Sequence, residues 1–344
     1  MPKDLKNGMH GNDLAHISLN STPYPMTPII RSLEWDPVET IVRIGNDCDN
    51  SPITWADDGN LYIAYGDGRG FIPNLTEKLG LGFGIISGDP PLINGINLRS
   101  SGENKRNGKT GKKGSGMLMV EQVLYLWLFH ADENGGQAQL AWSFDHSLNW
   151  TFSPWKFDAL GLCTFINFGQ NYDHARDNYV YAVSHDGKMA DEPADRMILM
   201  RVPKNRLIEQ AAYEFFVQIT DGKPVWSDDF NQRGAIFEHP DACLRSGISY
   251  HAPTKRYLWW QQIPNEPGHE DRGDTRFSGG FGIYDASEPW GPWTTVYYTR
   301  QWDVGSGERA EFPVKWMDKD GKTLYLAFSG DDNFSVRKAN LELF

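Results

Sequence analysis

The chain has 344 residues, 40% of them hydrophobic and 23% charged, a composition that allows a large buried core and excludes a disordered protein. Its formal net charge of −12 argues against a nucleic-acid-binding protein, because such proteins need a clustered positive surface. No run of apolar residues approaches the roughly 20 that a membrane-spanning helix requires.

With 35 glycines, 20 prolines and 13% aromatic residues, the sequence is typical of many short strands joined by tight turns. The first predicted strand covers residues 38–44. Five copies of a hairpin follow, each with one strand, a polar turn, and a second strand that carries a tyrosine near its start. The copies lie at 52–65, 117–128, up to 178–184, 249–260 and 315–328, with marker tyrosines Tyr62, Tyr125, Tyr181, Tyr257 and Tyr325.

Two more strands are predicted after each of the first four hairpins, but only one, at 334–344, follows the fifth. Four antiparallel strands make one blade of a β-propeller. The sequence therefore predicts an all-β fold, a five-bladed β-propeller, in a single domain over residues 1–344 with an N-terminal extension over 1–34. Strand 38–44 would complete the last blade and close the ring, which leaves no sheet edge exposed. The one predicted exception to strands is a short helix near 205–210.

Three segments resemble known propeller families. SFDHSLNW (143–150) resembles the Asp-box turn of sialidase-type propellers, with Ser147 where glycine is usual, and DASEPWGPW (285–293) resembles a turn of five-bladed family-43 glycosidases. DNSPITWADDGNLYIAYGDG (49–68) and RVPK (201–204) resemble a large bacterial propeller family with relatives among endo-arabinofuranan hydrolases. The resemblance implies a five-bladed propeller that acts on carbohydrate, with Asp145 and Trp150 in structural roles.

Polar residues are predicted to gather at one rim of the central axis. In a hairpin, residues equidistant from the turn lie opposite each other, so a turn at Asp58 places Asp49 opposite Asp67. The same count in the other hairpins pairs Lys113 with His130, Asn167 with His185, Arg245 with Gln262, and Glu311 with 328–329.

Glycoside hydrolysis needs two carboxyl groups, one to protonate the leaving oxygen and one to act as base or nucleophile. Asp49 and Asp67 are the predicted catalytic pair, because neighbouring carboxylates repel and raise one pKa. The family resemblance also implies a catalytic aspartate at the start of the first inner strand. Glu311 and Asp241 are the substitutes. The predicted substrate-binding residues are Lys113, His130, Asn167, His185, Arg245, Gln262 and Trp55, although polar strand ends are also ordinary solvated positions.

Two other functions remain open. A polysaccharide lyase would use a His or Tyr base and a cation that neutralises a uronate, for which His130, His185, Lys113 and Arg245 are available. A non-catalytic glycan-binding propeller would favour five equivalent sites, whereas the rim residues differ between hairpins and favour one asymmetric pocket.

The expected partner is a polysaccharide or oligosaccharide, with no nucleic acid, no membrane and a monomeric state. Three widely spaced cysteines suit neither a disulfide framework nor a zinc site, and no other metal motif is present. We therefore expect no cofactor or metal, although the resemblance leaves a structural calcium ion open. The polar first residues are no signal peptide, so the protein is either cytoplasmic or, as we expect for its substrate, secreted or periplasmic with the signal peptide absent.

Overall fold

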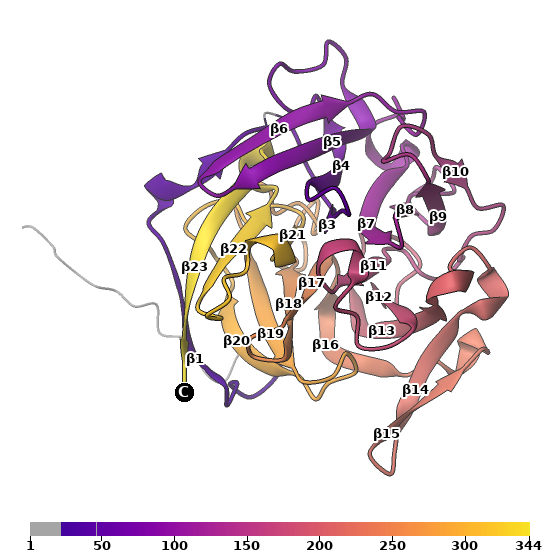
Figure 1. Ribbon diagram of the computed structural model, residues 1–344. Helices are drawn as coiled ribbons and strands as arrows, with labels where there is room; N and C mark the ends of the chain where they lie inside the picture. The colour runs from indigo at the N-terminus through magenta and orange to yellow at the C-terminus, as the bar shows by residue number, and fades with distance from the viewer. Residues whose placement is uncertain (1–21, 46) are drawn as a thin grey trace, which may run out of the picture.

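The computed structural model describes residues 22–45 and 47–344, and over these residues the chain is all-β (Figure 1). It contains 23 strands in four sheets there, and the only helical segments among the described residues are single 3₁₀ turns. No helix in this part of the chain is long and apolar enough to cross a membrane. The turns lie at Val38–Thr40, Gly108–Thr110, Gln170–Tyr172, Lys204–Arg206, Gln210–Ala212, Phe230–Gln232, Val314–Trp316 and Gly330–Asp332.

Two of the sheets are antiparallel and follow the chain strand by strand. The first has the order β3-β4-β5-β6 and the second the order β10-β9-β8-β7. Short turns join consecutive strands, which is why neighbours in sequence are neighbours in the sheet. The strands are β3 (Ile53–Trp55), β4 (Leu61–Gly68), β5 (Leu79–Asp89), β6 (Leu92–Leu98), β7 (Lys113–Val120), β8 (Val123–Phe129), β9 (Gln139–Ser143) and β10 (Thr151–Phe152).

The third sheet has ten strands and consists of two antiparallel halves. The halves join where β11 and β17 run parallel, with Ile166 opposite Ile248. One half holds β11 (Thr164–Asn167), β12 (Tyr179–His185), β13 (Ala194–Pro203), β14 (Glu214–Thr220), β15 (Lys223–Ser227) and β16 (Ala235–Cys243), which pairs with β13. The other half holds β17 (Ser246–His251), β18 (Arg256–Ile263), β19 (Gly280–Ala286) and β20 (Thr294–Thr299).

The fourth sheet brings the two ends of the described chain together. Its order is β1-β23-β22-β21, with β2 also paired to β23, and its strands are β1 (Ile30–Trp35), β2 (Val42–Arg43), β21 (Ala310–Glu311), β22 (Thr323–Phe328) and β23 (Ser335–Leu343). In Figure 1 the strands β3, β7, β11, β17 and β21 gather around the middle of the molecule. These five are the first strands, in chain order, of the groups β3–β6, β7–β10, β11–β16, β17–β20 and β21–β23, and we call them the inner strands.

The N-terminal strand differs from the prediction. Only Val42–Arg43 of the predicted strand 38–44 pairs with β23, and Val38–Thr40 forms a 3₁₀ turn that follows Pro37. Proline fixes its own φ and lacks an N–H, so it interrupts the strand pattern there. The long pairing with β23 is made instead by β1, within the segment assigned to an N-terminal extension. The predicted helix near 205–210 is also replaced by two separate 3₁₀ turns.

Aromatic side chains fill the space between neighbouring sheets. Trp127 of β8 lies 5.9 Å from Phe165 of β11, measured between ring centroids, and 6.0 Å from Tyr213. Phe83 of β5 stacks on Trp150 at 5.3 Å. Large rings bury much apolar area with few rotatable bonds, so they hold the sheets face to face.

Asp145 stabilises the turn between β9 and β10. Its carboxylate accepts hydrogen bonds from the Asn149 backbone N–H at 2.8 Å and from the Ser143 hydroxyl at 2.9 Å. Ser147, with φ of 73°, adopts the left-handed conformation that glycine takes most easily, and its hydroxyl accepts from Trp150 Nε1 at 3.0 Å. The turn therefore fixes Trp150 against Phe83.

Candidate active site

Charged side chains from the starting ends of the inner strands meet at one cavity of about 160 Å³. Asp49 lies just before β3, Lys113 begins β7, Arg245 directly precedes β17, and Glu308 lies just before β21. Inner strands that start at one end of a common axis bring their first residues together. The residues that line the cavity are Asp49, Asp67, Gly108, Lys109, Lys113, His130, Asp191, Arg245, Asp271, Arg276 and Glu308.

Asp49 is held by the backbone of β4. Its N–H and C=O pair with those of Gly66, so its partner in the register is Gly66, one residue away from the predicted Asp67. A Cβ at position 66 would lie 2.6 Å from Asp49 Oδ1, which means that only glycine leaves room for this carboxylate. Asn50, which lies between this pair and the regular pair Ile53–Ile63, has a positive φ of 48° at the place where the register slips.

The carboxylate of Asp49 is 6% exposed, and its Oδ1 has no hydrogen-bond partner among the described residues. Burial and the nearby charge of Asp67 raise the pKa of Asp49 to about 6, against the opposing effect of Lys113 and of two arginines. A buried carboxylate oxygen without a partner is costly, which is typical of a group that meets a ligand.

Asp67 is in a different electrostatic position from Asp49. It forms an ion pair with the buried ammonium group of Lys113, and it accepts the Gly108 backbone N–H at 3.0 Å. Its charge is therefore compensated within the protein. Asp67 lies at the cavity as predicted from the sequence, but it is tied to the neighbouring sheet through Lys113.

Glu308 is the second carboxyl group with a perturbed pKa in the cavity. Its side chain is 14% exposed, and its ion-pair partner, Arg245 Nη2, lies 3.7 Å from Oε2. Burial raises the pKa of Glu308 to about 8, with a further contribution from the charges of Asp49 and Asp191, although Arg245 opposes the change. The surroundings therefore favour the protonated form more strongly at Glu308 than at Asp49.

Asp191, from the connection between β12 and β13, holds the side chains of Arg245 and His130 at the cavity. Its carboxylate lies 2.7 Å from Arg245 Nη2 and 3.1 Å from His130 Nε2. Burial alone would raise the pKa of Asp191, but the hydrogen bond from His130 and the charge of Arg245 lower it below its usual range. This aspartate is permanently ionised, and it fixes the positions of Arg245 and His130.

The structure thus brings together five of the predicted site residues: Asp49, Asp67, Lys113, His130 and Arg245. It places three others, Trp55, Asn167 and Glu311, around a separate narrow cavity of about 10 Å³. Asn167 accepts a hydrogen bond from Thr54 at 3.0 Å, and Glu311 forms a buried ion pair with Arg309 at 2.7 Å. Burial raises the pKa of Glu311 to about 7.

His185 and Gln262 lie behind the cavity wall. His185 is fully buried, neither ring nitrogen has a hydrogen-bond partner among the described residues, and burial lowers its pKa to about 4. Gln262 donates to Gly273 O at 2.6 Å and to the Thr275 hydroxyl at 2.7 Å. It therefore supports the loop that carries Asp271 and Arg276. Its backbone pairs with Arg245, as predicted.

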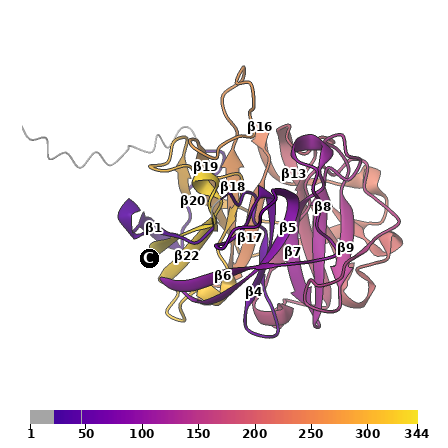
Figure 2. The ribbon, with the colours of Figure 1, turned by 90° about the horizontal axis from the view of Figure 1, so that it is seen from above.

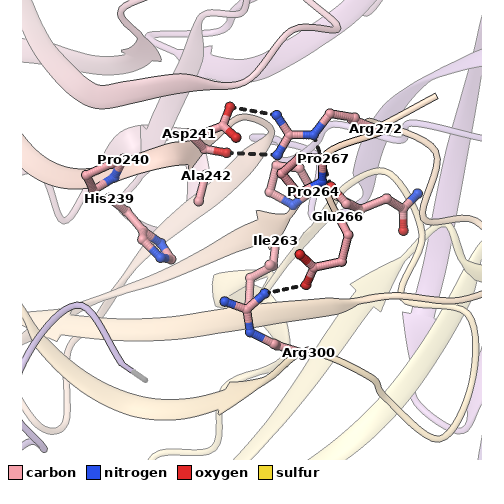
Figure 3. Close-up of a pocket in the computed structure, with 11 residues that line it drawn as sticks. His239, Pro240, Asp241, Ala242, Ile263, Pro264, Glu266, Pro267, Arg272 and Arg300 are labelled. Atoms are coloured by element: carbon pink, nitrogen blue, oxygen red, sulfur yellow. Dashed lines mark hydrogen bonds and ion pairs between the residues drawn. The ribbon is translucent and has the colours of Figure 1, made fainter. Parts of the chain in front are cut away.

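Asp241 lies in another pocket, shown in Figure 3. Its carboxylate pairs with Arg272 at 2.6 Å, and its side chain is 54% exposed. A second exposed ion pair, between Glu266 and Arg300 at 2.8 Å, lies nearby in the same view. Asp241 is therefore not among the residues that line the central cavity with Asp49.

Six of the residues that line the cavity were missed by sequence reasoning: Gly108, Lys109, Asp191, Asp271, Arg276 and Glu308. Glu308 lies just before an inner strand, the position that also marks Asp49, but a hairpin count about Lys319 selected Glu311 instead. Asp191 and Arg276 lie in long connections, where no strand pattern predicts their direction. Within the described residues no group of three or more His, Cys, Asp or Glu is arranged to hold a metal ion.

The comparisons with known proteins bear on the fold. No protein-family model and no curated protein sequence matches the chain. A Bacteroides ovatus protein of proposed hydrolase function resembles it with a TM-score of 0.50 and 10% identity, over 87% of this chain and 86% of the other. The two proteins share their overall fold.

Other solved structures that resemble the chain are glycoside hydrolases. A family GH43_1 enzyme from Xanthomonas citri, complexed with xylose, has a TM-score of 0.46 and 16% identity over 90% of each chain. The α-L-arabinofuranosidase PaAbf62A from Podospora anserina, in complex with cellotriose, has a TM-score of 0.45 and 11% identity, over 93% of this chain and 99% of its own.

Proposed function

We propose that the protein is a glycoside hydrolase that cleaves an oligosaccharide or polysaccharide with Asp49 and Glu308. The observation that carries this proposal is one cavity in which two buried carboxyl groups from different inner strands lie among fixed cations. Two carboxyl groups in environments that separate their pKa values are what glycosidic bond cleavage requires.

The proposed architecture is a five-bladed propeller. The groups β3–β6, β7–β10, β11–β14 and β17–β20 would form four blades, and β21–β23 with β1 the fifth. The pairing of the N-terminal β1 with the C-terminal β23 supports this interpretation, since it joins the two ends of the chain within one sheet. In such a ring the cavity lies at one end of the central axis.

Each cavity residue then has a role. Glu308, protonated at neutral pH, donates its proton to the leaving glycosidic oxygen. Asp49 is the second carboxyl group, which any geometry of glycoside hydrolysis requires on the opposite side of the bond. Asp67 keeps Lys113 in place and raises the pKa of Asp49. In this proposal Asp67 adjusts the pKa of Asp49 and is not itself a member of the catalytic pair, as the sequence had predicted it to be.

Asp191 positions the groups that contact the substrate. It holds Arg245 beside Glu308 and directs His130 toward the cavity. Arg245 is a potential donor to sugar hydroxyl groups, and the Nδ1 atom of His130 is a potential acceptor. His185 is sealed in the core, so His130 is the histidine of the cavity that a lyase mechanism would have to use.

Substitution of the two carboxyl groups tests the proposal. Asn and Gln keep the volume and remove the proton transfer, so Asp49→Asn and Glu308→Gln should each lower kcat roughly 10²–10⁴-fold. Asp241→Asn, in the pocket of Figure 3, is the matched control and should keep full activity. Suitable probes are xylo- and arabino-oligosaccharides, because the solved neighbours are named for xylose and arabinofuranoside.

Release of reducing ends measures hydrolysis, and ultraviolet absorbance at the same time measures the unsaturated product of a lyase. Full hydrolytic activity in both carboxyl variants would overturn the assignment. An absorbing product that does not depend on Glu308 would replace the hydrolase with a lyase.

A further inference from the structure

Phe277 is a large apolar side chain that is 62% exposed. It lies in the connection between β18 and β19, directly after Arg276, which lines the central cavity. Figure 2 shows part of this connection, in orange, standing out from the body of the molecule. An exposed aromatic ring beside a polar cavity is a common arrangement for a ligand that has both apolar and polar faces.

The backbone at Phe277 is fixed by its neighbours. Arg276 O accepts the Asp331 backbone N–H at 2.8 Å, and the Arg276 guanidinium donates to both Asp274 carboxylate oxygens at 2.9 and 2.7 Å. The same guanidinium lies 5.6 Å from the centroid of the Phe277 ring. These contacts fix the backbone before Phe277 and place the guanidinium of Arg276, which lines the cavity, beside the ring.

The segment that carries Glu308 packs against the backbone of Phe277. A Cβ at Gly305 would lie 1.9 Å from Arg276 O and 2.9 Å from Phe277 Cα, so the two segments touch. Thr275 O also accepts the Gly307 backbone N–H at 3.1 Å. Phe277 and the proposed acid therefore lie on two adjoining segments.

Other exposed phenylalanines have a different setting. Phe144 is 73% exposed in the turn held by Asp145, and Phe344 is 71% exposed at the end of the chain. Single exposed apolar residues of this kind are normal. Phe277 differs because its ring lies beside the guanidinium of Arg276, which lines the cavity. Moreover, the cavity of about 160 Å³ is smaller than the roughly 300–1,000 Å³ of sites that enclose a whole ligand, so an oligosaccharide must extend beyond it.

We propose that Phe277 is a stacking platform for a sugar unit of the substrate outside the cavity, and that it gives the enzyme its preference for longer chains. This inference rests on the proposed function. The C–H face of a pyranose or furanose ring packs on an aromatic ring, while its hydroxyl groups stay in water. The platform acts on binding of the distal sugar unit and takes no part in proton transfer.

The test compares Phe277→Ala, Phe277→Trp and the control Phe144→Ala on a series of xylo- and arabino-oligosaccharides from two to five units. For the pentasaccharide, Phe277→Ala should raise KM roughly 2- to 12-fold. The KM for the disaccharide and kcat at saturation should stay near those of the wild type. Phe277→Trp should restore the low KM, and Phe144→Ala should match the wild type at every length.

Equilibrium binding in the Glu308→Gln background, by calorimetry with the pentasaccharide, separates this platform from catalysis. Additional loss of affinity on adding Phe277→Ala supports the platform. Equal losses at all chain lengths, or the same loss in Phe144→Ala, would overturn it. Full activity of Glu308→Gln would overturn the proposed function and not the platform, whereas a wild-type protein that neither cleaves nor binds the series would overturn both.

Discussion

At the scale of single residues, the cavity holds Asp49 and Glu308 at different pKa values, about 6 and about 8. The proposed mechanism needs Asp49 ionised and Glu308 protonated, so kcat/KM should fall as the pH drops below about 6 and again as it rises above about 8. A bell-shaped pH profile of kcat/KM, measured on the free enzyme with substrate well below KM, checks this prediction.

A substitution of Lys113 tests whether the acidic limb of that profile reports the titration of Asp49. The charge of Lys113 lowers the pKa of Asp49, so Lys113→Met should move the acidic limb to higher pH and leave the alkaline limb nearly unchanged. An acidic limb that does not move in Lys113→Met would mean that Asp49 is not the group that titrates there.

Sequence reasoning found the residues that directly begin inner strands and missed those placed by loops. Asp49, Lys113 and Arg245 mark strand ends, and such positions are recognisable from the hairpin pattern alone. Glu308 was missed because β21 has only two residues, too few to define a register by counting. Asp191 comes from a connection whose path depends on its hydrogen bonds with His130 and Arg245, which no sequence pattern encodes.

At the scale of elements, a symmetric hairpin count works only while the strands are regular. Thr54 lies opposite Tyr62, as counted about Asp58, but the register slips by one residue before Asp49 reaches β4. The second hairpin slips in the same way, so Lys113 pairs with Phe129 instead of His130. The third count fails altogether, since the loop after β11 is long and Thr164 lies opposite Val183. Such irregularities come from backbone conformations that residue type does not determine.

The turn between β9 and β10 offers a prediction at this scale. Asp145→Ala removes the acceptor for the Asn149 backbone N–H and for the Ser143 hydroxyl, so it should destabilise the protein by about 1–3 kcal/mol. The kcat/KM of the folded variant should stay near that of the wild type, because the turn lies apart from the cavity residues. Thermal unfolding and steady-state kinetics check both parts, and a loss of turnover without a loss of stability would contradict it.

At the scale of the whole molecule, Arg309 ties remote strands together around the middle of the fold. Its guanidinium donates to Ser115 O on β7, to the Thr164 hydroxyl on β11 at 2.9 Å, and to Ser246 O on β17 at 2.8 Å. It also pairs with Glu311, and both side chains are 2% exposed. One buried cation thus contacts three strands from two sheets besides its own segment.

Removal of this cation should leave the buried carboxyl group of Glu311 without its ion-pair partner, as a charge or as a carboxylic acid that has taken up a proton. Arg309→Met should therefore lower the free energy of unfolding by about 3–5 kcal/mol. The double variant with Glu311→Gln should recover part of that loss, because the remaining side chain is neutral. Urea unfolding of the two variants gives both values, and a double variant no more stable than Arg309→Met would show that Glu311 is not the source of the cost.

The pairing of β1 with β23 makes the N-terminal strand part of the main core. Ile30 is 2% exposed and Leu33 is 7% exposed, and both pack in one cluster with Leu326 and Leu341 of the C-terminal strands. If β1 only covered the surface, truncation of these side chains would change the stability little. In a shared core, truncation lowers the stability, because a cavity remains where the methyl groups were.

Leu33→Ala should therefore destabilise the protein by about 2–5 kcal/mol, as much as Leu326→Ala in the middle of the same cluster. Arg31→Ala, on the solvent side of β1 with a 54% exposed side chain, is the matched control and should change stability by less than about 1 kcal/mol. Urea unfolding of the three variants, followed by tryptophan fluorescence, measures the differences. If Leu33→Ala behaved like Arg31→Ala, β1 would be a peripheral strand, and the proposed closure of the ring by the N-terminus would fail with it.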